Sequence, residues 1–245
     1  MRVAVCISGE LRTFNPDHYR EVFGDVDFFL HTNEYDERIK KLNPVIYSYE
    51  NIDFRRHPYF KINQDINPYD FLHSPQRVHP IFYEEDLNQL VDLEVERPGK
   101  WSSKPKHVLS MFYSIMQSNF LKKTYERDKK FEYDLVVRTR PDIDFIDEIK
   151  YSNYDDQSVW TPQTPNNLNG LYVNDHFAVS DSKNMDLYSE VFLNIPRLFY
   201  INKVDLIPEI LLKRYLDEVG LTISEYGMDY VVRRNDGRND VYMIK

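Results

Sequence analysis

The chain has 245 residues and a formal net charge of −9, with 40 acidic against 31 basic side chains. This length fits one α/β domain, and the acidic excess argues against a duplex-binding protein, which normally has a basic face. Cys6 is the single cysteine, so an intrachain disulfide is excluded. The N-terminal apolar stretch is too short for a secretion signal, and no stretch reaches the roughly 18 apolar residues of a membrane span. We therefore expect a cytoplasmic protein without a membrane span.

The N-terminal segment predicts a strand, a helix and a second strand. Residues 2–8 predict a strand, because residues 3–7 form a continuous apolar run, which is typical of a buried parallel strand. Asn15 and Pro16 predict the N-cap and the first position of a helix, and Gly24 predicts its end. A second apolar run covers residues 26–31. This βαβ pattern predicts an α/β fold with a mixed, mainly parallel sheet flanked by helices.

The rest of the chain alternates between helical and strand patterns. Residues 52–80 are rich in proline, asparagine and aromatics without a clear period, and we expect an ordered loop there, followed by a short helix at 84–93. The clearest helical period runs from 103 to about 125. Further strands are expected at 133–140, 158–161, 172–180, 221–225, 230–234 and 241–244, and further helices at 182–192, capped by Ser182, and at 208–219. With no repeat or composition break, we expect one domain over residues 1–245.

The segment RTRPDIDF is the sharpest chemical feature. A buried strand runs directly into Arg138 and Arg140 and then into Asp142 and Asp144. Side chains alternate along an extended chain, so the two aspartates can project the same way and hold a divalent metal, Mn²⁺ or Mg²⁺, together with substrate phosphates. The two arginines match oxyanion geometry and are expected near the same phosphates.

A second candidate segment follows the first strand. Ser8, Gly9 and Arg12 come where a ligand can meet backbone N–H groups, and Gly9 permits a close approach. Neither GxGxxG nor GxxxxGK[ST] is present, which removes the main support for a dinucleotide or P-loop site. The same residues also fit an ordinary turn with a surface Arg12. His31, at the end of the second strand, is the histidine best placed to face a ligand.

A third candidate lies at Asp175 and His176, inside a strand-like run. A neighbouring acid and imidazole can act as a general base or as a metal ligand. A surface hydrogen-bonded pair beside a strand has the same pattern. The other histidines show no metal spacing such as HExxH, and no GxSxG elbow favours nucleophilic hydrolysis.

The chain also resembles a known group of proteins. The segments RVAVCISGELRTF, DFFLHT, YDLVVRTRPDIDF and NDHFAVSDSKNMDLYSEVF resemble poorly characterised glycosyltransferase-like proteins of bacterial polysaccharide gene clusters, large viruses and phages. The likeness covers most of the chain in order and is weakest between about Ile52 and Gly99. It implies a GT-A fold, with a nucleotide-sugar half at about 1–145 and an acceptor half at 146–245.

The resemblance also implies roles for the candidate residues. Asp142 and Asp144 match a metal-binding pair, the residues from Ser8 to Arg12 match a nucleotide loop, and Asp175 lies where an acceptor site is built. Here the pair follows Arg-Pro instead of a plain hydrophobic strand, which leaves open which aspartate contacts the metal. The implied chemistry is transfer of a glycosyl group from a nucleoside diphosphate sugar to a hydroxyl of a glycan acceptor, with Asp175 as the base if the reaction inverts the anomeric centre.

Two other functions remain open at this point. One is a nucleotidyltransferase or a related nucleotide-processing enzyme, which a Gly- and Lys-rich loop near the start would favour, although the chain has 7 glycines. The other is a GT-A-like module that binds a nucleotide without turnover. The donor base and sugar, the acceptor, the stereochemical outcome and the oligomeric state are not specified by the sequence.

Overall fold

The computed structural model describes residues 1–50, 105–154, 157–164 and 170–243. Within these residues a seven-stranded sheet has the spatial order β3 (Ile46–Tyr49), β2 (Asp27–Thr32), β1 (Val3–Gly9), β4 (Leu135–Thr139), β7 (Phe177–Ser180), β6 (Ser158–Pro162) and β8 (Thr222–Tyr226). A smaller sheet contains β10 (Asn239–Tyr242), β9 (Tyr230–Arg233) and β5 (Ile143–Phe145). The expected loop at 52–80 and helix at 84–93 lie outside the described residues.

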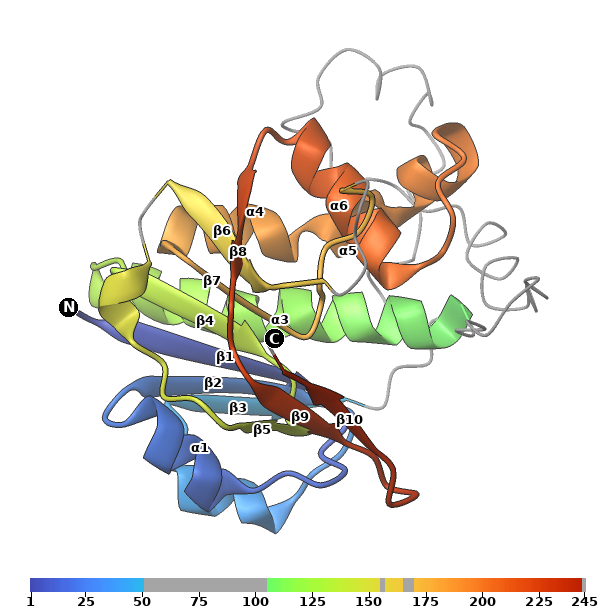
Figure 1. Ribbon diagram of the computed structural model, residues 1–245. Coiled ribbons are helices and arrows are strands. Elements are labelled where there is room, and N and C mark those ends of the chain that lie inside the picture. Colours follow the sequence, from blue (N-terminus) through green and yellow to red (C-terminus); the bar gives the residue numbers. More distant parts are fainter. Residues whose placement is uncertain (51–104, 155–156, 165–169, 244–245) are drawn as a thin grey trace.

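The larger sheet is mixed but mainly parallel. β1 pairs in parallel with β2 and β4, β2 with β3, and β6 with β8, whereas β7 runs antiparallel to both β4 and β6. Helices flank the sheet (Figure 1). This confirms the predicted α/β, Rossmann-like architecture. One consequence matters for the site: β1, β2, β3 and β4 all end at the same edge of the sheet, and β7 begins there.

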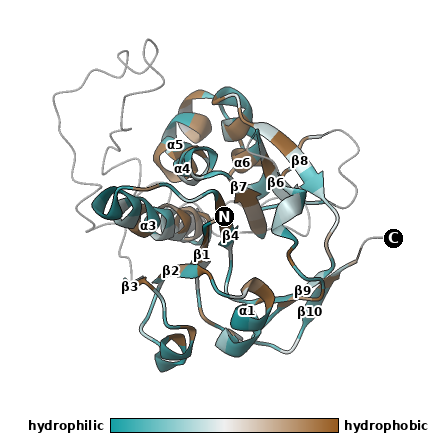
Figure 2. Cartoon of the chain, turned by 90° about the vertical axis from the view of Figure 1, so that its left-hand side faces the viewer, coloured by the Kyte–Doolittle hydropathy of each residue, from teal (hydrophilic) through white to brown (hydrophobic). Residues whose placement is uncertain are grey.

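The larger sheet separates two parts of the core, and β1 contributes side chains to both. Ala4 and Cys6 belong to the cluster under α3 (Pro105–Lys129), whereas Val5 and Ile7 belong to the cluster around α1 (Pro16–Phe23). This follows from the alternation of side chains along a strand. Figure 2 shows α3 on one side of the sheet, with α4 (Ser182–Ser189), α5 (Val191–Pro196) and α6 (Pro208–Glu218), and α1 on the other. The uninterrupted apolar run in β1 therefore reflects burial on both faces.

Local capping explains where two of the helices begin. Asn15 caps α1 as predicted, because its side chain accepts a hydrogen bond from the backbone N–H of His18 at 3.3 Å. The predicted cap Ser182 of α4 is wrong. Asp181 takes that position and accepts from the N–H of Asn184 at 2.9 Å. The hydroxyl of Ser182 is instead bonded inside the core.

That hydroxyl belongs to a buried ionic cluster, which consists of Lys122, Glu126, Ser182 and Asp186 and joins α3 to α4. Nζ of Lys122 lies 3.0 Å from Glu126, 2.8 Å from Asp186 and 2.6 Å from the Ser182 hydroxyl. The Ser182 hydroxyl donates to Glu126 at 2.7 Å. The sequence analysis did not foresee this cluster. Among the described residues, no helix is both long and apolar enough to cross a membrane.

The C-terminal strands differ in detail from the prediction. A strand was expected at 172–180, but the observed strand β7 covers only Phe177–Ser180, and the residues before it form a loop. β3 and the short η1 helix (Glu37–Leu42) were not predicted. The turn at Asp236 and Gly237 is confirmed between β9 and β10, where Gly237 donates to the carbonyl of Arg234 at 3.1 Å. β10 continues the small sheet, whose third strand β5 carries Asp144.

Cys6 gives a first prediction about this core. Its side chain is fully buried, and burial raises the pKa of the thiol to about 12. The reactive thiolate is therefore almost absent at a pH of about 8, where an ordinary exposed cysteine reacts readily. We expect iodoacetamide to leave Cys6 unmodified in the folded protein and to modify it fully in denaturant, as measured by intact mass. Rapid modification of the native protein would contradict this packing.

Candidate functional site

The candidate site lies at the edge of the larger sheet where β1, β2 and β4 end (Figure 1). Ser8 of β1 pairs in register with His31 of β2, and Ile7 pairs with Thr139 of β4. β7 starts at this edge, with Phe177 opposite Thr139. Residues from four strands therefore meet where ligands collect in open α/β sheets.

A buried aspartate holds two guanidinium groups at this edge. Asp142 follows β4, and its side chain is 2% exposed. Its Oδ1 accepts from Nε of Arg140 at 2.5 Å and its Oδ2 from Nη2 at 2.9 Å, which is a two-pronged contact. Nη1 of Arg12 donates to the same Oδ2 at 3.5 Å. Burial lowers the pKa of Arg140 and Asp142 raises it, with a net rise, so Arg140 remains charged.

The end of β1 closely approaches the segment that follows β4. Gly9 has a φ of +120°, and a Cβ atom added to it would lie 3.7 Å from Cδ of Pro141. This distance is an ordinary contact, so the backbone conformation and not a lack of space requires glycine. Next to it, Ser8 is buried, and its Oγ makes no hydrogen bond within the described part of the chain. Ser8 thus places at the strand end a hydroxyl that has no partner among the described residues.

The loop that carries Arg12 is fixed by a second arginine. Arg38 of η1 donates from Nη2 to the carbonyl of Leu11 at 2.9 Å and from Nη1 to the carbonyl of Phe14 at 3.0 Å. Asp36 accepts from Nη2 of Arg38 at 2.6 Å and also caps η1. The guanidinium of Arg38 therefore replaces the regular hydrogen bonds that an irregular loop lacks. Sequence reasoning missed Arg38 because it is far from the loop in the chain.

Asp144 pairs with a different arginine. It lies on β5, between two core residues, and its side chain is 26% exposed. Its Oδ2 accepts a hydrogen bond from Nε of Arg233 at the end of β9. The backbone N–H of Arg233 donates to the carbonyl of Asp142 at 2.9 Å. The two aspartates are thus near neighbours, and each is neutralised by arginine.

This pairing does not suit a divalent metal. Mg²⁺ requires oxygen lone pairs at about 2.0–2.1 Å in near-octahedral geometry. Both oxygens of Asp142 and one oxygen of Asp144 already accept from guanidinium groups. Among the described residues, no group of three or more His, Cys, Asp or Glu side chains could hold a metal ion. The metal pair Asp142 and Asp144 stays a prediction from the sequence.

Arg138 and Asp175 meet on the other side of β4. Arg138 is 2% exposed, and its Nη1 donates to the backbone carbonyl of Asp175. Its Nε makes no hydrogen bond within the described residues, and burial lowers its pKa. The Asp175 side chain is 8% exposed. The buried guanidinium therefore supports the backbone that carries the carboxylate.

A small network fixes the loop before β7. The amide of Asn174 donates to the hydroxyl of Tyr230 at 2.9 Å, and Nδ1 of His176 lies 3.0 Å from the same hydroxyl. The backbone N–H of His176 donates to Oδ1 of Asn174 at 2.9 Å. Burial, followed by the charge of Arg140, lowers the pKa of His176 well below its usual value, so the ring is neutral. Its Nε2 is 3.9 Å from Asp175, which is too long for a hydrogen bond.

Glu209 is a functional candidate that sequence reasoning missed. It lies in the first turn of α6, and its carbonyl accepts from the N–H of Val173 at 3.2 Å. Burial and then the negative charge of Asp175 raise the pKa of Glu209 to about 7. A carboxyl group that titrates near neutrality is suited to proton transfer. In the sequence, an acid at a helix start has the simpler explanation of a helix-dipole interaction.

His31 lies at the same edge but contacts a different set of residues. Its Nδ1 is 2.9 Å from the hydroxyl of Ser48, and its ring packs edge-on against Tyr113 of α3. It is 2% exposed, so it is a core residue of β2. Two groups of predicted site residues are in contact. The first contains Arg12, Arg140 and Asp142, and the second contains Arg138 and Asp175. The remaining predicted residues lie near this edge without joining either group: Ser8, Gly9, His31 and Asp144.

Three tyrosines cluster on β3 and on the segment that follows β2. Tyr35, Tyr47 and Tyr49 have ring centroids 5.6 to 6.2 Å apart. Tyr35 and Tyr49 are exposed, whereas the hydroxyl of Tyr47 donates to the carbonyl of Glu34 at 2.9 Å. Exposed aromatic rings provide faces on which a base can stack. The sequence shows the high tyrosine content but not this grouping.

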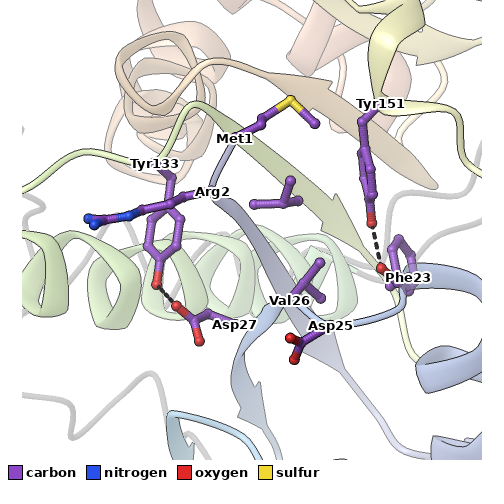
Figure 3. Close-up of a pocket in the computed structure, with 9 residues that line it drawn as sticks. Met1, Arg2, Phe23, Asp25, Val26, Asp27, Tyr133 and Tyr151 are labelled. Atoms are coloured by element: carbon purple, nitrogen blue, oxygen red, sulfur yellow. Dashed lines mark hydrogen bonds between the residues drawn. The ribbon is translucent and has the colours of Figure 1, made fainter.

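A pocket of about 430 Å³ opens at the opposite edge of the sheet, where β1 and β2 begin (Figure 3). Tyr133 donates there to Asp27 at 2.6 Å, and Tyr151 donates to the carbonyl of Phe23 at 2.9 Å. These hydroxyls are used within the protein. None of the predicted site residues lines this pocket, so we place the candidate site at the carboxyl edge.

The comparison with known proteins provides no family. The function is therefore inferred from the geometry of the candidate site and from the resemblance of the sequence segments. No family model matches the chain, and no curated protein matches it either.

Proposed function

We propose that the chain is a glycosyltransferase that moves a sugar from a nucleoside diphosphate sugar to an acceptor hydroxyl, as a GT-A-type enzyme of glycan synthesis. The observation that carries this proposal is the pair Arg12 and Arg140, held by buried Asp142 at the ends of parallel strands. Planar guanidinium groups match the oxygens of a diphosphate. A carboxylate, Asp175, lies on the neighbouring loop, where it can meet an acceptor.

Each residue has a role in this proposal. Arg12 and Arg140 bind the diphosphate and stabilise the charge that develops on it as the glycosidic bond breaks. Ser8 provides a hydroxyl at the end of β1, and the Tyr35–Tyr47–Tyr49 cluster stacks the base. Asp175 accepts the proton of the acceptor hydroxyl in an inverting transfer. Arg138 positions the backbone of Asp175 through its carbonyl.

The divalent metal expected from the sequence remains a separate prediction. Manganese or magnesium would supply further positive charge to the leaving diphosphate. The arginine pairing of Asp142 and Asp144 does not suit such an ion, and no step above depends on one.

Calorimetric titration with UDP-, GDP- and dTDP-sugars tests the function. We expect one nucleotide class to bind, and Asp142→Ala to weaken this binding by about 10- to 100-fold, because charge-assisted hydrogen bonds contribute about 1.5–3 kcal/mol. Asp236→Ala is the matched control, since Asp236 is an exposed aspartate that also pairs with an arginine, Arg238. The control should bind like the wild type.

Other outcomes would favour the alternative functions. A folded protein that binds none of these donors would contradict the proposal. Binding without release of the nucleoside diphosphate, in the presence of a panel of sugar acceptors, would indicate a binding module. Consumption of a nucleoside triphosphate with release of pyrophosphate would indicate a nucleotidyltransferase.

A further inference from the structure

We propose that the donor diphosphate is held directly by Arg12 and Arg140, without a divalent metal, and that Asp142 is a positioning residue for these two arginines. This inference rests on the proposed function, because it concerns the same donor. It assigns the two aspartates a role that differs from the metal-binding role expected from the sequence.

The first argument is the geometry of Asp142. Its carboxylate is almost fully buried, and each of its oxygens accepts from Arg140 within 2.9 Å. A cation at about 2.0–2.1 Å from either oxygen would lie against a guanidinium group of the same charge. The repulsion between these like charges would be strong at this short distance and low exposure. Metal binding would therefore require both arginines to leave Asp142.

The second argument is the supply of hydrogen-bond donors. Arg140 uses Nε and Nη2 for Asp142, and Arg12 uses Nε for Glu10 and Nη1 for Asp142. Within the described residues, Nη1 of Arg140 and Nη2 of Arg12 have no hydrogen-bond acceptor. These nitrogens carry N–H groups that a phosphate oxygen can accept from. The side chains are 20% and 31% exposed, so a ligand can reach them.

The third argument is that the frame around the arginines is rigid. The carbonyl of Arg140 accepts from the hydroxyl of Tyr19, and the carbonyl of Asp142 accepts from the N–H of Arg233. Arg38 fixes the loop that carries Arg12. Both guanidinium groups are thus oriented before a ligand arrives. Such preorganised charge can stabilise a diphosphate without the reorganisation that a flexible side chain would need.

Binding of free UDP, GDP and dTDP tests the inference. Each is titrated by calorimetry into the wild type in excess EDTA and, separately, in Mn²⁺. We expect equal affinity in the two buffers. Arg140→Met should weaken binding in EDTA by about 10- to 100-fold, and Arg140→Lys by less, because lysine keeps the charge but lacks the planar fork. Arg238→Met, at an exposed arginine paired with Asp236, is the control and should change nothing.

A double-mutant cycle separates positioning from general damage. If Asp142 acts through the arginines, Asp142→Asn should weaken binding, and Arg140→Met should add little further loss in that background. Additive losses would overturn the positioning role. Binding that requires Mn²⁺, is lost in Asp142→Asn and Asp144→Asn, and is unchanged in Arg140→Met would overturn the inference and leave the proposed function standing. No binding of any nucleoside diphosphate by the folded protein would overturn both.

Discussion

Replacing Asp175 by asparagine is expected to lower kcat for donor consumption by about 10²- to 10⁴-fold, which is the usual contribution of a general base. The affinity for the nucleotide should change far less than kcat, because within the described residues the Asp175 carboxylate makes no hydrogen bond or ion pair to Arg12 or Arg140 and acts on Arg140 through its charge. Release of the nucleoside diphosphate is measured at saturating donor and acceptor. A loss confined to the nucleotide affinity would contradict the proposed role of Asp175 as the base.

The folding of this variant can be anticipated from the contacts of Asp175. Arg138 bonds to the backbone carbonyl of Asp175, which asparagine retains. The Asp175 carboxylate has a histidine nitrogen at 3.9 Å, and that histidine is neutral. Asparagine is also nearly the same size as aspartate, so the loop before β7 should keep its structure. Loss of activity with an unchanged thermal midpoint would therefore be a chemical effect.

The ionisation of Glu209 is expected to make the proton transfer to Asp175 depend on pH. Its pKa of about 7 is raised by burial and by Asp175, so Glu209 takes up a proton as the pH falls through this value. Protonation removes one of the two negative charges that favour proton transfer from the acceptor. We expect kcat to fall as the pH drops through about 7 in the wild type, and this inflection to be absent in Glu209→Gln. An identical profile in both proteins would remove Glu209 from the site.

Patterns within a few residues of the sequence were enough to predict several of the strands and helices. β1, β2 and β4 each contain a run of three or more apolar residues, and α1 has both a capping asparagine and a terminal glycine. These signals arise within a few residues of one another. β3 and β5 have 4 and 3 residues, and the backbone of β5 is held by β9 from much later in the chain. A short strand that depends on a distant partner leaves no period in its own sequence.

The sequence predicted which residues meet at the candidate site, but not the arginine partner of each aspartate. The polar residues after β1 and β4 pointed to the carboxyl edge, where they do meet. The sequence predicts a metal pair because Asp142 and Asp144 can project the same way along an extended chain and a cation would relieve their repulsion. Arg12 is 130 positions from Asp142, and Arg233 is 89 from Asp144. Only the folded arrangement shows which countercharge each carboxylate receives, and the same holds for Glu209 beside Asp175.

Replacing Lys122 by methionine is expected to destabilise the protein by about 3–5 kcal/mol, because removing one partner of a buried ion pair leaves the other charge uncompensated. Lys122 has no exposed side-chain surface, and its ammonium group contacts both Glu126 and Asp186. Burial lowers its pKa, but the two carboxylates raise it above its usual value, so Lys122 remains charged. Methionine keeps the packing volume and removes the charge.

The neighbouring Lys123 provides the matched control for this variant. It also pairs with Asp186, at 3.1 Å, but its side chain is 54% exposed. Lys123→Met should cost about 0–1 kcal/mol, as expected for an exposed pair. Urea unfolding of both variants, with an unchanged dependence on denaturant, gives the two free energies. Equal costs would show that burial adds nothing to the pair. A large difference would show that the contact between α3 and α4 depends on the buried charge of Lys122. Without it, Glu126 and Asp186 would lie in the core without their common partner.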